Sequence, residues 1–389
     1  MTTRLSPPAV GAILAGMLVA GCESVGYYGQ AVHGHLSLMA SRQPIDVLLT
    51  DSAAHSRERF ALVLEIRDFA SDVLALPDNR SYRTVVPTPD DGVVWSVVAT
   101  PPYSLEPRAW CFPIAGCTSY RGYFARAEAD AYAGRLAAEG LDVTVDPVPA
   151  YSTLGWFDDP LPGGLLRWPD PDVAAIVFHE LAHQRFYLKG DSAFNEAFAT
   201  AVAEEGVARW LAQRGDSRAV EAWRDAQRRR LQFVDLLLET RAGLVELYAS
   251  GLPDAEMQVG KDRLFGELRR RYADLQASWN GAPGFDRWMA RPLNNARLAA
   301  VATYREQLPA FRGLLHCVGG DLPAFYAAVQ RLAELPQAER DPAFGTSCRR
   351  RPERASSAAL GADWRRRISA PGAGCRGAVS AAAGPARTE

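Results

Sequence analysis

Three features that mark common protein classes are scarce in this 389-residue sequence. Beyond the N-terminal segment, no apolar run approaches the roughly 20 residues that a membrane-spanning helix needs. The six cysteines show no CxxC spacing, so a cysteine-ligated zinc site is not expected. Charge of one sign is not in excess, because 43 Lys and Arg stand against 45 Asp and Glu, and a net charge of −2 indicates no particular partner. The sequence also has no internal repeat.

The first 21 residues have the pattern of a secretory signal peptide. One positive charge precedes an apolar stretch of about a dozen residues, 9–20, which is too short to cross a bilayer. It ends in LVAGC (residues 18–22), which resembles a bacterial lipobox, where Cys22 would be lipidated and become the mature N-terminus. The alternative is an ordinary signal peptide cleaved near Gly21. We therefore expect an exported bacterial lipoprotein of the cell envelope, membrane-anchored and periplasm-facing, a location that argues against a nucleic-acid partner.

Export also bears on the cysteines and on the rest of the chain. Cys111 and Cys117 are expected to form a short-loop disulfide outside the cytosol. Residues 346–389 are rich in Ala, Arg, Gly, Ser and Pro and lack apolar periodicity, so we expect a disordered tail. Between signal peptide and tail, residues 22–345 are expected to form one domain. Its sheet-containing part is at about 80–160, and its helical part is at about 170–335.

Apolar periodicity predicts a mainly helical α+β fold with a small mixed β-sheet. The expected helices are 30–76, 124–140, 217–250 and 253–279, and the expected strands are 83–86, 93–99 and 141–145. The sheet therefore precedes the most informative stretch of the chain, His179-Glu180-Leu181-Ala182-His183.

This stretch predicts a metal site on a helix, because the apolar run 173–178 before it can bury that helix. Residues i and i+4 share a helix face, so the imidazoles of His179 and His183 point at one spot. Glu180 is rotated off that face, where it can reach a water on the metal as general base without being a ligand. Two neutral imidazoles suit Zn²⁺, which at a catalytic site takes three protein ligands. The non-catalytic alternative is a lipid-anchored scaffold that keeps zinc only to hold two helices together.

The third ligand is expected from the next helix. Gly190 is a natural helix C-cap, and Asp191 or Ser192 caps a second helix that should pack antiparallel to the first. His183 lies seven residues before Gly190 and Glu196 lies six after it. At about 1.5 Å of rise per residue, each is roughly 10 Å from the turn. They can therefore face each other, and Glu196 is the expected third ligand.

The surroundings of the ligands are also predicted from this second helix. Ligating histidines usually donate their other N–H to a carboxylate or carbonyl. Glu204, farther along the helix, and Asn195, beside Glu196, are the candidates for that support.

Together, HELAHQ (179–184) and NEAFA (195–199) resemble the zinc site of the gluzincin metallopeptidases, and among these the M1-type aminopeptidases. Over residues 22–335 the chain is similar to a family of bacterial lipoproteins described as predicted aminopeptidases. The motifs that carry this wider resemblance are WCFP (110–113), YRGYF (120–124), YSTLGWFDDP (151–160) and LNNA (293–296). The resemblance implies a zincin-like fold, one Zn²⁺ ion and removal of N-terminal residues from peptides. A short segment between His183 and Glu196, and the lack of a GxMEN-type motif, leave an endopeptidase open.

A peptide hydrolase also needs a donor for the oxyanion that forms during hydrolysis. Tyr304 and Tyr123 are the candidates, although core packing is the common reason for a tyrosine in either place.

Substrate-binding residues are predicted on both sides of the metal motif. An extended peptide adds to a sheet edge in zincin-type peptidases, and residues 151–160, with Gly155 and Asp158, are the candidate edge. The alternative is a turn packed under the zinc helix by Trp156 and Phe157. Asn295 is a candidate for binding substrate backbone, or it caps the following helix.

Overall fold

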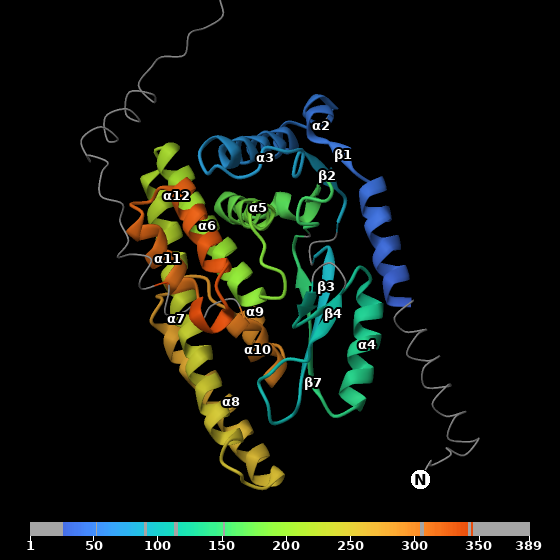
Figure 1. Ribbon diagram of the computed structural model, residues 1–389, viewed down its shortest axis with the longest axis vertical. Helices are drawn as coiled ribbons and strands as arrows, with labels where there is room; N and C mark the ends of the chain where they lie inside the picture. The colour runs from blue at the N-terminus through green and yellow to red at the C-terminus, as the bar shows by residue number, and fades with distance from the viewer. Residues whose placement is uncertain are drawn as a thin grey trace, which may run out of the picture. The chain divides into compact units, whose positions relative to one another are not determined.

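The computed structural model describes residues 26–51, 53–88, 92–112, 116–150, 152–303, 307–340 and 344 (Figure 1). Helices dominate and short strands form small sheets, so the expected mainly helical α+β class is confirmed. Cys22, the expected signal peptide, the expected tail and Tyr304 lie outside the described residues.

The first described residues are helical, as the apolar spacing predicts, but a short strand interrupts the helices. The elements are a helix at 26–40, β1 (Gln43–Pro44), α2 (Ile45–Asp51) and α3 (Ala54–Asp72). Helix α3 buries an apolar face that includes Val63, Ile66 and Ala70. This face packs on the helices that carry the metal motif.

The sheet region differs from the single mixed sheet predicted. Its strands are β2 (Thr84–Val86), β3 (Val94–Thr100), β4 (Trp110–Phe112), β5 (Gly116–Thr118), β6 (Arg121–Tyr123), β7 (Asp142–Val148) and β8 (Leu161–Pro162). They form two three-stranded sheets, β1-β2-β8 and β6-β3-β7, and the hairpin β4-β5. Val85 pairs with Leu161 and Val97 with Val145, so the two predicted strands before residue 100 belong to different sheets. Apolar periodicity predicts that a segment is a strand, but it does not predict which other strand it pairs with.

Helices cover the sheet β6-β3-β7 on two sides (Figure 1). Helix α4 (Arg126–Ala138) packs on one side, and α10 (Asn295–Thr303) packs on the other. Strand β3 is consequently buried along most of its length. Its sequence, VWSVVAT, is nearly continuous in apolar residues because both faces are covered.

The remaining helices form two cores. The larger one joins α3 to α5 (Asp170–Arg185), α6 (Ser192–Gln213), α11 (Leu308–Cys317) and α12 (Leu322–Ala333). The smaller one lies between α7 (Ser217–Tyr248), α8 (Asp254–Ala277), α9 (Asp286–Met289) and α10. Fully buried Phe198 contacts Phe311 and Phe325 at the centre of the larger core. Each such side chain stabilises the fold by about 1.5–3 kcal/mol, which fixes α6 in place.

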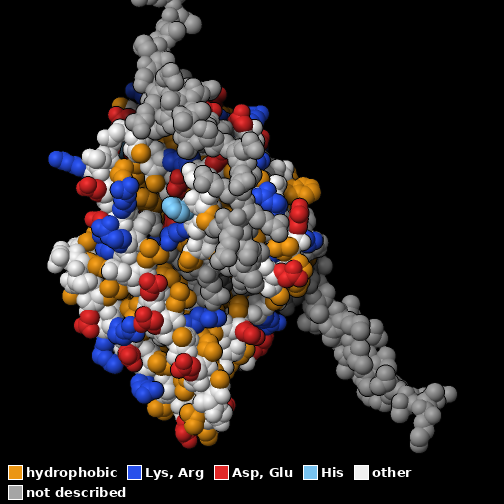
Figure 2. All heavy atoms as spheres, turned by 60° about the vertical axis from the view of Figure 1, so that its left-hand side comes forward, with side chains coloured by type: hydrophobic (Ala, Val, Ile, Leu, Met, Phe, Trp, Pro, Cys, Tyr) orange, Lys and Arg blue, Asp and Glu red, His pale blue; other side chains and the backbone are white. Residues whose placement is uncertain are grey.

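The surface in Figure 2 mixes positive, negative and apolar side chains without a large area of one charge sign. Among the described helices, none combines the length and apolar character that crossing a membrane requires.

Candidate metal centre

Helix α5 carries HELAH, and its ends explain its position. Asp170 and Asp172 lie in the first turn, where negative charge stabilises the helix dipole. The helix ends at Arg185, earlier than a cap at Gly190 predicts, because Phe186 adopts an extended backbone and packs against Phe194 and Phe198. Gly190 keeps a left-handed conformation, with φ +84°, but in the turn that leads into α6.

The turn between α5 and α6 is held by side chains of α6 itself. The carboxylate of Asp191 caps the helix by accepting a hydrogen bond from the Phe194 N–H at 3.0 Å. Asn195 accepts from the Leu188 N–H at 2.7 Å and donates to the Leu188 carbonyl at 2.8 Å. Arg340 forms an ion pair with Asp191. These contacts fix the angle at which α6 packs along α5, and hence the position of Glu196.

Two imidazoles and a carboxylate converge between these helices. The Nε2 atoms of His179 and His183 are 3.1 Å apart. Glu196 places Oε2 at 3.2 Å from the Nε2 of His179 and Oε1 at 3.6 Å from the Nε2 of His183. Within the described residues, this is the one group of three or more His, Cys, Asp or Glu side chains found with metal-site spacing.

The spacing of these atoms fits a tetrahedral zinc site. With Zn–N and Zn–O distances of roughly 2.0–2.2 Å, ligand atoms at tetrahedral angles lie about 3.3–3.5 Å apart. The observed 3.1–3.6 Å brackets that value. Three ligands also leave one position open, as catalytic zinc sites do. The donor set therefore fits the expected metal.

Glu180 lies beside this cluster rather than in it. Burial raises the pKa of its carboxyl, and the charge of Glu196 raises it further, while His179 and His183 lower it. Glu180 is therefore a buried carboxyl that interacts electrostatically with all three members of the cluster.

The predicted support for the histidines is not found. Asn195 faces the turn, and Glu204 bonds instead to Arg312 of α11 at 2.8 and 2.6 Å. Eight residues separate Glu204 from Glu196, about 12 Å along the helix. Within the described part of the chain, the buried Nδ1 of His183 has no hydrogen-bond partner.

Tyr123 is not near the cluster, but two other tyrosines are. The ring centroid of Tyr187 is 6.4 Å from that of His183, and burial and the charge of Glu196 raise the pKa of Tyr120. Tyr123 is buried against Tyr27 and Tyr132, on the α4 side of its sheet. Tyr120 is 38% exposed, but its hydroxyl end reaches the interior: burial and the charge of Glu196, and then that of Glu180, raise its pKa. Tyr120 precedes β6, which begins at Arg121, so the strand pattern gives no signal for its position.

The β4-β5 hairpin brings Tyr120 to the cluster. The expected disulfide between Cys111 and Cys117 closes this hairpin. A Cβ on Gly116 would be 3.2 Å from both the Gly190 nitrogen and the Lys189 side chain, so the hairpin packs directly on the α5-α6 turn. Thr118 then holds the chain by donating to the Tyr120 carbonyl at 2.7 Å.

Asn295 does not reach the cluster. It is fully buried, and its amide donates to the Pro102 and Ser104 carbonyls while its carbonyl accepts from Tyr248. Its side chain is thus occupied in joining α10 and α7 to the loop after β3. The substrate-binding role predicted for Asn295 is replaced by a structural one.

Residues 152–160 form a turn rather than a strand, so they do not offer a sheet edge. Trp156 and Phe157 are exposed, so the alternative of a turn packed under α5 by these two rings is also wrong. Gly155 does lie against Gln184, the residue after His183, and Asp158 is half-buried beside it.

The anchor of this turn is Asp159, and its burial predicts a pH dependence of stability. Burial raises the pKa of the Asp159 carboxyl from 3.8 to about 6 against the opposing hydrogen bonds of Thr153. The folded state therefore keeps this proton at a pH where the unfolded chain has lost it. The stability contributed is fully present below pH 3.8 and is lost as the pH rises through about 6.

We expect Asp159→Asn to abolish this dependence. Between pH 4 and 6, the free energy of unfolding of the wild type should fall relative to the variant by about 2 kcal/mol, since each pH unit inside this window contributes at most about 1.4 kcal/mol. Urea unfolding at several pH values measures it, with Asp158→Asn as the neighbouring control. If the free energy of unfolding depends on pH in the same way for wild type and Asp159→Asn, the raised pKa of Asp159 is wrong.

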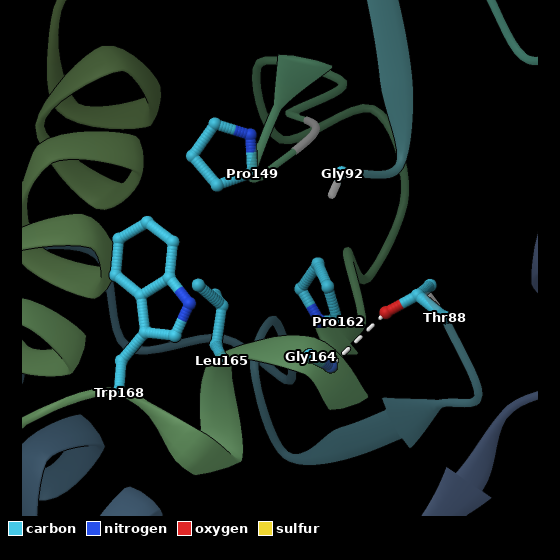
Figure 3. Close-up of a pocket in the computed structure, with 7 residues that line it drawn as sticks. All are labelled: Thr88, Gly92, Pro149, Pro162, Gly164, Leu165 and Trp168. Atoms are coloured by element: carbon cyan, nitrogen blue, oxygen red, sulfur yellow. Dashed lines mark hydrogen bonds between the residues drawn. The ribbon is translucent and has the colours of Figure 1, made fainter. Parts of the chain in front are cut away.

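Two cavities of the structure are not part of the cluster. The one in Figure 3 lies between η1 (Gly163–Arg167) and the segment around Gly92, where Thr88 accepts a hydrogen bond from the Gly164 N–H. Its volume of about 10 Å³ holds roughly one water molecule. The other, about 280 Å³, lies where α6 meets α7.

Fold and site define a mainly helical α+β protein in which two imidazoles and a carboxylate can hold a metal ion beside a further carboxylate. The chain matches the family described as "Putative aminopeptidase" over residues 26–344, and it belongs to that family. No curated protein matches the chain, and neither does any solved structure. Family membership suggests peptidase activity.

Proposed function

We propose that this protein is a zinc-dependent aminopeptidase that removes N-terminal residues from peptides. The observation that carries the proposal is the convergence of His179, His183 and Glu196 within 3.1–3.6 Å, with Glu180 beside them. The family match supports the peptidase class. An endopeptidase with the same site is the second candidate, since no residue that binds a substrate ammonium is identified.

His179, His183 and Glu196 would hold the zinc ion, which when bound lowers the pKa of a water and polarises the scissile carbonyl. Glu180 accepts the proton of the attacking water and later donates it to the leaving amine. Tyr120, whose pKa is raised by burial and by the charge of Glu196, would donate its hydroxyl proton in a hydrogen bond to the developing oxyanion. A tyrosine hydroxyl is protonated at neutral pH, and the raised pKa of Tyr120 extends that range upward.

The location of the activity is part of the same proposal. A lipid on Cys22 would anchor residues 22–345 to the membrane on the periplasmic side. The helix at 26–40 begins four residues after Cys22, so the folded domain would start close to the bilayer.

Free and blocked peptides test the exopeptidase assignment. We expect aminoacyl-type fluorogenic substrates and peptides with a free N-terminus to be cleaved, and the same peptides to resist once they are acetylated. The control is the zinc content of the purified chain, measured on the same preparation. If only the acetylated peptides are cleaved, the protein is an endopeptidase and the aminopeptidase assignment is wrong.

A further inference from the structure

The turn at residues 152–159 exposes two large aromatic side chains next to the candidate site. Trp156 is 72% exposed and Phe157 is 54% exposed. Large apolar groups gathered on a surface mark places where a protein binds something. Trp156 and Phe157 are therefore a candidate binding surface.

The backbone that presents them is fixed. The carboxylate of Asp159 accepts from the Thr153 N–H at 3.0 Å and from its hydroxyl at 2.7 Å. The Asp159 N–H donates to the hydroxyl of Ser81, and its carbonyl accepts from the Tyr82 N–H at 2.6 Å. Leu154 and Gly155 are both left-handed, with φ +56° and +83°. The left-handed conformation costs Leu154 about 1–2 kcal/mol, so the surrounding contacts must stabilise this backbone. The same backbone presents the two rings at the surface.

The turn lies on the Glu180 side of α5. Glu180 and Gln184 are four residues apart and share one helix face. The Gln184 amide donates to Asp159 at 3.0 Å and to Ser81 at 3.2 Å. A Cβ on Gly155 would be 3.8 Å from the Gln184 side chain. The charge of Glu180 also contributes to the raised pKa of Asp159, which places the two carboxyls near each other.

A second element braces the turn from the other side. The ring centroids of Phe157 and His35, in the helix at 26–40, are 4.7 Å apart. Arg42 donates to the Asp158 carbonyl at 3.2 Å. The Phe157 ring and the backbone of the turn are thus held by the helix at 26–40 and by Arg42.

We propose that Trp156 and Phe157 form an apolar subsite that binds a large hydrophobic side chain of the peptide substrate. The proposal rests on the proposed function and names its substrate class. A membrane surface is the other chemistry that exposed aromatics suit, but the bonds from Gln184 connect this turn to the helix that carries Glu180. Continuity with the candidate site therefore favours a peptide.

Substrate preference tests the subsite. With the zinc-loaded full chain, we expect Trp156→Ala to lower kcat/KM for N-terminal Leu and Phe peptides by about tenfold or more, the usual effect of a lost apolar contact. Peptides with N-terminal Ala should lose less. Trp156→Phe should retain part of the preference. Val259→Ala, which truncates a 70% exposed apolar side chain on α8, is the control.

A binding readout separates this proposal from the proposed function. The same peptides are titrated into Glu180→Gln protein, with and without Trp156→Ala, by calorimetry. If the wild type cleaves no peptide but binding of Leu and Phe peptides still depends on Trp156, the apolar subsite is supported and the proposed hydrolase function is wrong. If cleavage occurs and Trp156→Ala leaves the preference unchanged, the subsite is wrong and the hydrolase stands. If neither cleavage nor binding occurs, both are wrong.

Vesicles of phosphatidylethanolamine and phosphatidylglycerol complete the test. We expect Trp156→Ala to bind them as the wild type does. If Trp156→Ala weakens vesicle binding and leaves peptide binding unchanged, these rings contact lipid, and the subsite is overturned.

Discussion

Replacement of Glu180 by Gln is expected to lower kcat for peptide hydrolysis by about 10²–10⁴-fold, the usual contribution of a general base. Gln has nearly the same shape but accepts no proton. The ligand atoms of His179, His183 and Glu196 do not depend on Glu180, so the zinc content should stay unchanged. Steady-state kinetics and elemental analysis of one preparation measure both quantities.

Glu205→Gln is the matched control for this variant. Glu205 lies on α6 and pairs with Arg209 at 2.7 Å, so the same change of charge there should leave kcat within about twofold, as for surface substitutions. A Glu180→Gln protein that retains both zinc and full activity would rule out the proposed proton transfer. Inactivity of the wild type and the variant alike, with zinc bound in both, would favour the scaffold instead.

Replacement of Glu196 by Gln is expected to weaken zinc binding by more than about a hundredfold. Loss of a group that only orients a ligand costs 10–100-fold, and Glu196 supplies a ligand atom and the negative charge facing two imidazoles. Burial acts to raise the pKa of Glu196, but hydrogen bonds from His179 and His183 outweigh it and hold that pKa well below its usual range. Competition with a chromogenic chelator measures the affinity.

Thermal unfolding gives an independent measure of the same loss. Zinc at 100 times its Kd stabilises the folded state by about 2.7 kcal/mol, so the wild type should gain in Tm on zinc addition and Glu196→Gln should not. Glu204→Gln, on the same helix but paired with Arg312, is the control and should keep the zinc-dependent shift. Equal shifts in wild type and Glu196→Gln would show that the zinc binds elsewhere.

The sequence predicts those parts of this site that local chemistry determines. Helical spacing alone places the two imidazoles of HELAH on one face, and a capping aspartate and a glycine indicate where α6 begins. Glu196 lies opposite the two imidazoles as predicted, although α5 ends at Arg185 and the equal distances to Gly190 on which the prediction relied are wrong. Each of these inferences spans fewer than twenty residues, where backbone geometry leaves little choice.

Residues that come from distant segments are not predicted in this way. Tyr120 reaches the cluster because the β4-β5 hairpin packs on the α5-α6 turn, and no periodicity reports that contact. Asn295 looks like a surface amide in sequence but is buried by the loop after β3, almost 200 positions away. The end of α5 at Arg185 is decided by the aromatic core that Phe186 enters, which overrides the local glycine signal.

The residues of the candidate site fall into two groups, one from the continuous α5-α6 segment and one from distant parts of the chain. His179 and Glu196 are 17 positions apart, so all ligand atoms come from one short, continuous segment. Such a segment can be grafted into another helical scaffold with its capping residues. A graft of this segment would not include the groups around Glu180. Ser81, Tyr120 and Asp159 come from three other stretches of the chain. Affinity for a metal would thus depend on one local segment, whereas chemistry at that metal would require the whole fold.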